Sequence, residues 1–434
     1  MIHRLGFKQF YIDLSIEIHG GRIVGGKMGD FSVFSSPLFV AQIQNRAGEA
    51  ATIKSSEQWD TVSLSQSRKE SEFVFSGYNG IPELCVMIQV RKERGCLIWK
   101  VKVLNDSPEW SVMRISYPMP VLGQENFEMF VPQFGGRIVR NAGKMPFSIH
   151  TTYPGTFTMQ FFSVYTGTSG VYLGVEDGRG AVKDFWAKSE NGTFSLSADF
   201  FAVGGGLAGN SFDAYGEARW QPFTGDWFDS AMIYADFVKK KAEWLPEFGR
   251  PDTAKCFRDI PFWLNDYIPN IPAQGENKPM LLSAGSDIYE PEHWYRAPIE
   301  LQEQLGVPIA CHVYNWHKIP FNIEYPHFLP AKDVFLKNAP ELRKHNIYVM
   351  PYINAVSWES RDGEMGHEVN FENTGRHGSV ILENGKTLRE SYPQKTVSGF
   401  TSDLVQMCPE YQPWHNIMEN LTRERYCLSC AAFP

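Results

Sequence analysis

The first half of the chain carries the alternating pattern of apolar and polar residues that is typical of short β-strands. Leu14, Ile16 and Ile18 alternate with polar residues, and residues 99–103 repeat the pattern. A period of two places one face of each strand on a core and the other in water. Short runs of the same kind recur between turn residues, at 73–75, 86–90 and 171–175. Because helical periodicity is almost absent, residues 1–225 are predicted to form a sandwich of antiparallel sheets.

The pattern changes to helical spacing near residue 225. Asp226 is suited to cap a helix, and the apolar residues that follow it recur at helical spacing. Pro and Gly residues then interrupt the pattern between residues 244 and 253. We therefore expect a linker helix and a linker over residues 226–253.

Residues 254–434 alternate between apolar runs and helical patterns. Strands are predicted at 260–264, 307–314 and 347–353, with helices at 294–305, 330–345 and from Pro409 onward. Nearly continuous apolar strands between helices indicate a parallel sheet, either a barrel or open. A polar insertion at 359–402 interrupts the alternation. The segment is therefore expected to hold about three βα units.

Composition and charge exclude several classes of function. Of the 434 residues, 43% are hydrophobic and 21% charged, so the chain is globular rather than disordered. A net charge of −8 without a Lys/Arg cluster argues against nucleic acid as a partner. No apolar run is long enough to span a membrane, and residues 1–14 lack the apolar stretch of a signal peptide. We therefore expect a cytoplasmic protein that binds neither nucleic acid nor a membrane.

Two short motifs resemble a phosphate-binding turn and a zinc site, but each lacks a feature that such a site requires. Residues 204–209 satisfy the G-x-G-x-x-G pattern, yet no helical period follows them, as a phosphate-binding turn requires. Cys427 and Cys430 lack a second close pair of Cys or His ligands, which argues against a zinc site. We expect no cofactor and no metal.

Polar and aromatic side chains gather where the predicted parallel strands end. They are Asp266 after the first strand, Trp316 and His317 after the second, and Tyr352, Asn354 and Trp358 at and beyond the end of the third. Ligands of parallel α/β barrels bind at these carboxyl ends. Aromatic rings offer apolar faces to sugar rings, and Asn, His and Asp hydrogen-bond hydroxyls. The six residues are therefore predicted to form a carbohydrate-binding site, with structural packing as the alternative for both Trp residues and for His317.

Segments spread over nearly all of the chain resemble a family of bacterial glycoside-hydrolase-like proteins. Their order and spacing carry the resemblance, and they include Tyr117-Pro118, Tyr153-Pro154-Gly155, and residues 222–227, 312–317 and 350–354. The family joins a galactose-mutarotase-like β-supersandwich to a (β/α)8 barrel similar to that of α-galactosidases. The resemblance implies a multidomain β plus α/β fold, with an N-terminal antiparallel β-supersandwich, a linker helix and an incomplete C-terminal TIM-type (β/α) barrel.

The resemblance also implies retaining glycosidase chemistry, in which one carboxylate attacks the anomeric carbon and a second protonates the leaving oxygen. These carboxylates are expected at the ends of the fourth and sixth barrel strands. The chain instead ends after the helix from Pro409, and residues 425–434 contain no further apolar strand. We therefore expect a chain that is truncated within the barrel, has no catalytic residues, is inactive, and associates or aggregates through its open barrel edge.

Three hypotheses follow for function. The leading one is a glycoside-hydrolase-like protein that acts on or binds carbohydrate, by descent from a retaining glycosidase. The second is a non-catalytic carbohydrate-binding or structural β-sandwich protein with a vestigial barrel. The third, a lyase or epimerase, requires His or Glu residues that converge in a groove of the sandwich, which spacing along a sequence cannot show.

Overall fold

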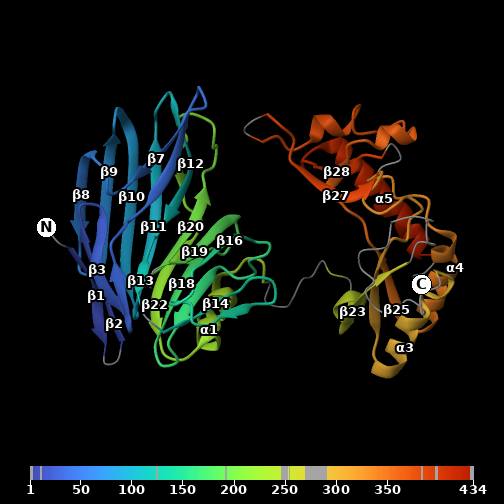
Figure 1. Cartoon of the computed structure of the whole chain (residues 1–434), viewed down its shortest axis with the longest axis horizontal. Coiled ribbons are helices and arrows are strands. Elements are labelled where there is room, and N and C mark those ends of the chain that lie inside the picture. Colours follow the sequence, from blue (N-terminus) through green and yellow to red (C-terminus); the bar gives the residue numbers. More distant parts are fainter. Residues whose placement is uncertain are drawn as a thin grey trace. The chain divides into compact units, whose positions relative to one another are not determined.

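The computed structural model describes residues 3–9, 12–123, 126–190, 193–245, 253, 255–268, 291–382, 385–395 and 399–430. The chain divides into two compact units, residues 1–250 and 251–434, which Figure 1 colours blue to green and yellow to red. Most of the expected linker beyond residue 245 lies outside the described residues. No helix in the described part of the chain is long and apolar enough to cross a membrane.

The first unit contains two large sheets whose described strand pairs are all antiparallel. One sheet runs in the order β1 (His3–Gln9), β2 (Ile12–His19), β3 (Arg22–Met28), β4 (Phe31–Phe34), β13 (Val121–Gly123), β20 (Thr193–Phe201), β12 (Trp110–Tyr117), β6 (Val40–Asn45) and β7 (Ala50–Lys54). In the same sheet β19 (Lys183–Glu190) pairs with β20 and with β16 (Phe147–Tyr153), and β5 (Ser36–Pro37) pairs with β3.

The other sheet runs in the order β15 (Arg137–Val139), β14 (Glu128–Val131), β17 (Phe161–Tyr165), β18 (Gly170–Glu176), β22 (Glu217–Phe223), β11 (Cys96–Asn105), β10 (Ile81–Glu93), β9 (Glu70–Tyr78) and β8 (Trp59–Gln66), with β21 (Phe212–Asp213) on β11.

One apolar core joins the two sheets. Ile16 and Phe31 of the first sheet share a buried cluster with Phe75 and Trp99 of the second. Along β9 every second residue is buried, as the alternating sequence pattern predicts. Burying a large apolar side chain such as Phe73 or Phe75 stabilises the fold by about 1.5–3 kcal/mol. The predicted antiparallel sandwich is therefore confirmed.

Helix α1 (Trp227–Lys241) begins at a reciprocal cap. The Asp226 side chain accepts a hydrogen bond from the Phe228 amide (2.8 Å), and the Asp229 side chain accepts one from the Asp226 amide (3.0 Å). Tyr234 and Phe237 form the buried face of the helix and pack with aromatic residues of β17 and β18. The helix that the sequence predicted as a linker therefore packs against the second sheet of the first unit.

The second unit contains a parallel sheet of three strands, β23 (Phe262–Tyr267), β24 (Ile309–Tyr314) and β25 (Ile347–Pro351), in that order. The helices around them are α2 (Lys255–Arg258), α3 (Arg296–Leu305) and α4 (Asp333–Lys344), and a 3-10 turn, η1, spans Pro291–His293. The predicted α/β segment is confirmed, but its first strand lies later than the sequence indicated. Residues 265–267 belong to β23 because they pair in register with β24, although Asn and Asp are disfavoured in strands.

The polar insertion also contains regular secondary structure. A small antiparallel sheet joins β26 (Ser357–Glu359), β28 (Thr401–Gln406) and β27 (Arg389–Lys395). Two 3-10 turns, η2 (Asp362–Met365) and η3 (Gly375–Gly378), and helix α5 (Gln412–Cys430) complete the unit. Between these elements lies a buried apolar cluster that includes Trp358, Phe371 and Trp414.

Candidate functional site

The carboxyl ends of β24 and β25 are tied together by hydrogen bonds around Tyr352. The Tyr352 amide donates to the Val313 carbonyl oxygen (2.8 Å), and the Trp316 indole Nε1–H donates to the Tyr352 carbonyl oxygen (2.7 Å). The residues that follow the second and third strands therefore lie together, as the parallel arrangement predicts.

Aromatic side chains cluster around Tyr352 at this edge. The Tyr352 ring stacks on Tyr314, with centroids 4.4 Å apart and planes 16° apart. The rings of His312 and Phe321 lie 5.8 Å and 6.1 Å from it. All four side chains are partly exposed. They form an aromatic surface at the end of the sheet.

A pocket of about 370 Å³ lies beside this surface. Its lining residues come from the end of β25, from β26 and from the other two strands of the small sheet: Tyr352, Ile353, Asn354, Ala355, Val356, Ser357, Leu388, Arg389, Glu390, Leu404 and Gln406. Asn354 shapes the wall, because its Oδ1 accepts hydrogen bonds from the amides of Val356 (2.9 Å) and Ser357 (3.0 Å). Two of the predicted binding residues, Tyr352 and Asn354, therefore line one pocket.

Three other predicted residues, Trp316, His317 and Trp358, are buried, each with 0% exposure. Trp316 packs between Phe328 and Phe335. The Nδ1 of His317 bonds the Ile319 carbonyl oxygen (2.7 Å), and burial lowers the pKa of His317 to about 4. The imidazole is therefore neutral at neutral pH. These side chains hold the strand ends in place and expose no surface to a ligand.

Asp266 is not among the residues that line the pocket. It pairs in register with Val313, and the next residue, Tyr267, pairs with Tyr314. Because side chains alternate along a strand, Asp266 shares the face on which Val313 packs, opposite the face of Tyr267. Burial raises the pKa of Asp266 to about 6, and a hydrogen bond from the Tyr267 amide opposes this rise.

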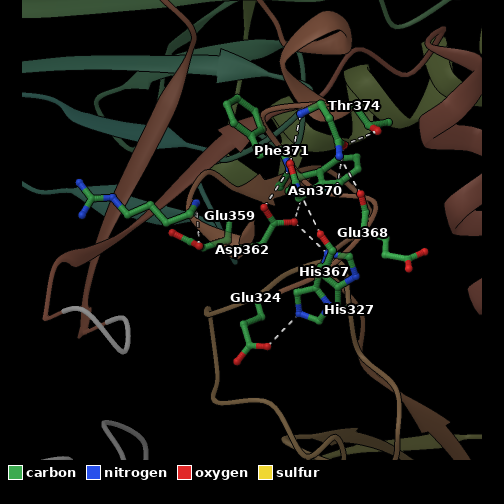
Figure 2. A network of polar contacts seen from close by, with 12 residues as sticks. Glu324, His327, Glu359, Asp362, His367, Glu368, Asn370, Phe371 and Thr374 are labelled. Carbon is green, nitrogen blue, oxygen red and sulfur yellow. Dashed lines mark hydrogen bonds and ion pairs between the residues drawn. The ribbon is translucent and has the colours of Figure 1, made fainter. Parts of the chain in front are cut away.

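A network of polar contacts that the sequence analysis missed lies around Asp362, His327 and His367 (Figure 2). Asp362 Oδ2 accepts a hydrogen bond from the Trp358 indole (2.6 Å) and lies 2.8 Å from His327 Nε2. The His327 ring stacks on His367, with centroids 3.6 Å apart, and His367 Nε2 lies 3.0 Å from Glu324 Oε2. Each imidazole is therefore held by its own carboxylate. Asp362 and His367 lie in the polar insertion, but Glu324 and His327 precede it by more than 30 residues, so spacing along the sequence could not pair them.

Glu359 lies at the edge of the same network and is fully buried. Its carboxylate accepts hydrogen bonds from the amides of Arg361 (3.0 Å) and Asp403 (3.4 Å). Burial, as the largest cause, raises the pKa of Glu359 to about 7. The side chain can therefore hold a proton near neutral pH, although it does not line the pocket.

Within the described residues, no three His, Cys, Asp or Glu side chains are grouped so that they could hold a metal ion.

Comparison with known proteins adds a family context to this geometry. Residues 212–427 match a family described as a domain of unknown function (DUF6259). A curated protein of Bacteroides thetaiotaomicron, named "Putative glycoside hydrolase", is 20% identical over 349 residues, which are 78% of this chain and 46% of that protein. The chain is therefore similar in sequence to a protein named as a glycoside hydrolase. It spans about half the length of this curated relative.

Solved structures confirm the fold of the chain. An α-N-acetylgalactosaminidase of Bifidobacterium bifidum, in complex with GalNAc, is 11% identical, with a TM-score of 0.64 over 96% of this chain and 68% of that chain. An α-galactosidase of Lactobacillus brevis is 9% identical, with a TM-score of 0.50 over 97% of this chain and 62% of that chain. The predicted fold class, a β-sandwich followed by part of a TIM-type barrel, and the predicted family resemblance are both confirmed.

Proposed function

We propose that the second unit of this glycoside-hydrolase-like protein binds a carbohydrate in the pocket at the end of β25. The observation that carries the proposal is that Tyr352 and Asn354 line one pocket of about 370 Å³. Pockets for small ligands measure roughly 300–1,000 Å³ and occur at the carboxyl ends of parallel strands. The pocket is large enough for a monosaccharide.

The groups around the pocket suit a sugar. The stack with Tyr314 and the two main-chain hydrogen bonds hold Tyr352 in one position, so its ring is preorganised for an apolar sugar face. Asn354 uses its Oδ1 within the turn, which leaves its Nδ2 amide to donate to a hydroxyl. Glu390 and Gln406 add further polar groups.

We propose binding without hydrolysis. Retaining glycosidases place two carboxyl groups about 5–5.5 Å apart across the glycosidic bond. Among the described residues that line the pocket, only Glu390 carries a carboxylate. Asp266 and Glu359, the side chains with raised pKa values nearest in sequence to the strand ends, do not line it. The described lining of the pocket therefore does not supply the second group that the reaction requires.

Calorimetric titration of the whole chain with methyl α-D-galactopyranoside and N-acetyl-D-galactosamine tests the proposal. The second sugar is chosen because a structural relative is an α-N-acetylgalactosaminidase. We expect Tyr352→Ala to weaken binding about tenfold, since an aromatic contact contributes about 0.5–1.5 kcal/mol beyond the area it buries and a factor of ten corresponds to about 1.4 kcal/mol. Tyr348→Ala is the matched control, because Tyr348 lies on β25, four residues before Tyr352, and does not line the pocket. Equal affinity in the Tyr352→Ala variant and the unaltered chain would overturn the proposal.

A further inference from the structure

A second polar and aromatic cluster lies on the first unit, on four neighbouring strands of the larger sheet, β16, β19, β20 and β12. Ile149, Phe185 and Phe200 of these strands point into the core. Asp184 and Asp199 are within one residue of these core positions and pair in register on β19 and β20. By strand alternation they belong to the opposite face. That face is therefore acidic at its centre.

Each carboxylate is held by its own set of neighbours. Asp184 accepts a hydrogen bond from the Thr152 hydroxyl (2.6 Å) and lies 2.9 Å from His150 Nε2. Asp199 accepts from the Ser116 hydroxyl (2.5 Å) and the Trp186 indole (3.0 Å), and the Arg114 guanidinium lies 3.4 Å away. The two side-chain sets meet at one point, because the His150 and Trp186 rings stack with centroids 3.8 Å apart and planes 9° apart.

Asp184 and Asp199 lie directly opposite each other, an arrangement that the sandwich does not need for its stability. Like charges directly opposite each other on neighbouring strands destabilise a sheet. Asp184 and Asp199 are also largely withdrawn from water, at 8% and 4% exposure. The apolar core lies on the other face, so the cluster does not fill it. Local conflicts of this kind are expected at functional sites.

We propose that this face of the sandwich is a second carbohydrate-binding site, separate from the pocket at the end of β25. The stacked rings of His150 and Trp186 provide an aromatic surface for a sugar ring. The His150 and Arg114 side chains, 45% and 30% exposed, hydrogen-bond the hydroxyl groups, and the buried carboxylates of Asp184 and Asp199 hold them in place. Two adjacent carboxylates disfavour an anionic ligand, and the stacked rings of His150 and Trp186 suit the apolar face of a neutral pyranose.

The test first weakens binding at the pocket with Tyr352→Ala and then measures the binding that remains. In a Tyr352→Ala chain, calorimetric titration with methyl α-D-galactopyranoside, methyl α-D-glucopyranoside and N-acetyl-D-galactosamine should still show binding of at least one sugar. His150→Gln keeps a hydrogen-bonding group beside Asp184 and removes the ring, and it should weaken this binding at least about tenfold. Trp186→Phe keeps a ring and should abolish the change in tryptophan fluorescence on titration.

Lys188→Ala is the matched control, because Lys188 lies two residues from Trp186 on β19 and its side chain is 60% exposed. It should leave affinity unchanged. No binding of any of the three sugars to the Tyr352→Ala chain would overturn the proposal, as would binding that His150→Gln does not affect, or capture of a polyamine in place of a sugar. Weaker binding to the Tyr352→Ala chain than to the unaltered chain bears on the pocket, whereas the binding that remains in Tyr352→Ala and its response to His150→Gln bear on this face, so failure of either site is recognised separately.

Discussion

The indole Nε1–H of Trp316 donates a 2.7 Å hydrogen bond to the main-chain oxygen of Tyr352. The bond joins a fully buried side chain after β24 to a partly exposed residue after β25. Since Trp316 also packs on Phe335 of α4, the position of Tyr352 depends on the apolar core beneath it. Trp316 therefore supports the pocket from the core, and Tyr352 lines it.

Trp316→Phe should destabilise the second unit more than a comparable loss of ring volume does. The change leaves the Tyr352 carbonyl oxygen without its indole donor, which costs about 1–3 kcal/mol. Trp294→Phe is the control, because Trp294 is equally buried in the same core and its Nε1 has no hydrogen-bond partner among the described residues. Urea unfolding of both variants measures the difference. Equal losses would show that the Trp316 bond contributes nothing.

Glu359 should make the stability of the second unit decrease with rising pH. Its pKa in the fold, about 7, exceeds the ordinary value of 4.5, so the folded chain holds a proton that the unfolded chain releases. This contribution is fully present below the unfolded value and is lost as pH rises through the folded value. Each pKa unit corresponds to about 1.4 kcal/mol.

Glu359→Gln mimics the protonated form and should flatten the change in unfolding temperature between about pH 5 and pH 8. Glu368→Gln, an exposed change in the same insertion, should leave the pH profile as it is. Parallel profiles for the unaltered chain and Glu359→Gln would contradict the proton-holding role.

The outer edge of β23 should promote association of the chain. Among the described strands β23 pairs with β24 alone, and Phe262 and Trp263 are 40% and 41% exposed. Unpaired N–H and C=O groups beside apolar side chains favour edge-to-edge pairing. Sedimentation velocity should show larger species as concentration increases, and Trp263→Lys should reduce them. Phe228→Lys, at an exposed apolar position of α1, is the control and should have little effect.

The 434-residue chain should not hydrolyse aryl α- or β-glycosides. Hydrolysis with retention needs a nucleophile and a proton donor, and the pocket that we propose for the sugar presents Glu390 alone among its described lining residues. Release of nitrophenol by the purified chain is the measurement. Turnover that disappears in Asp266→Ala or Glu390→Gln would show that these residues act in catalysis rather than in packing or binding.

The pattern of apolar and polar residues was enough to predict the order and type of the main elements. Alternation of period two predicted the sandwich, and apolar runs between helical patterns predicted the parallel strands β23, β24 and β25. The proximity of Trp316 to Tyr352 also followed, because parallel strands bring their carboxyl ends to one edge. These features depend on local periodicity and on one general rule of topology.

Which of these side chains are accessible to a ligand depends on tertiary packing. The register of β23 against β24 sets the face on which Asp266 lies, and one residue of shift would reverse it. The pairing of His327 with Asp362 joins residues 35 positions apart, and that of His150 with Asp184 joins residues 34 positions apart. Such contacts result from how strands and loops pack over long separations, and periodicity within a segment contains no information about them.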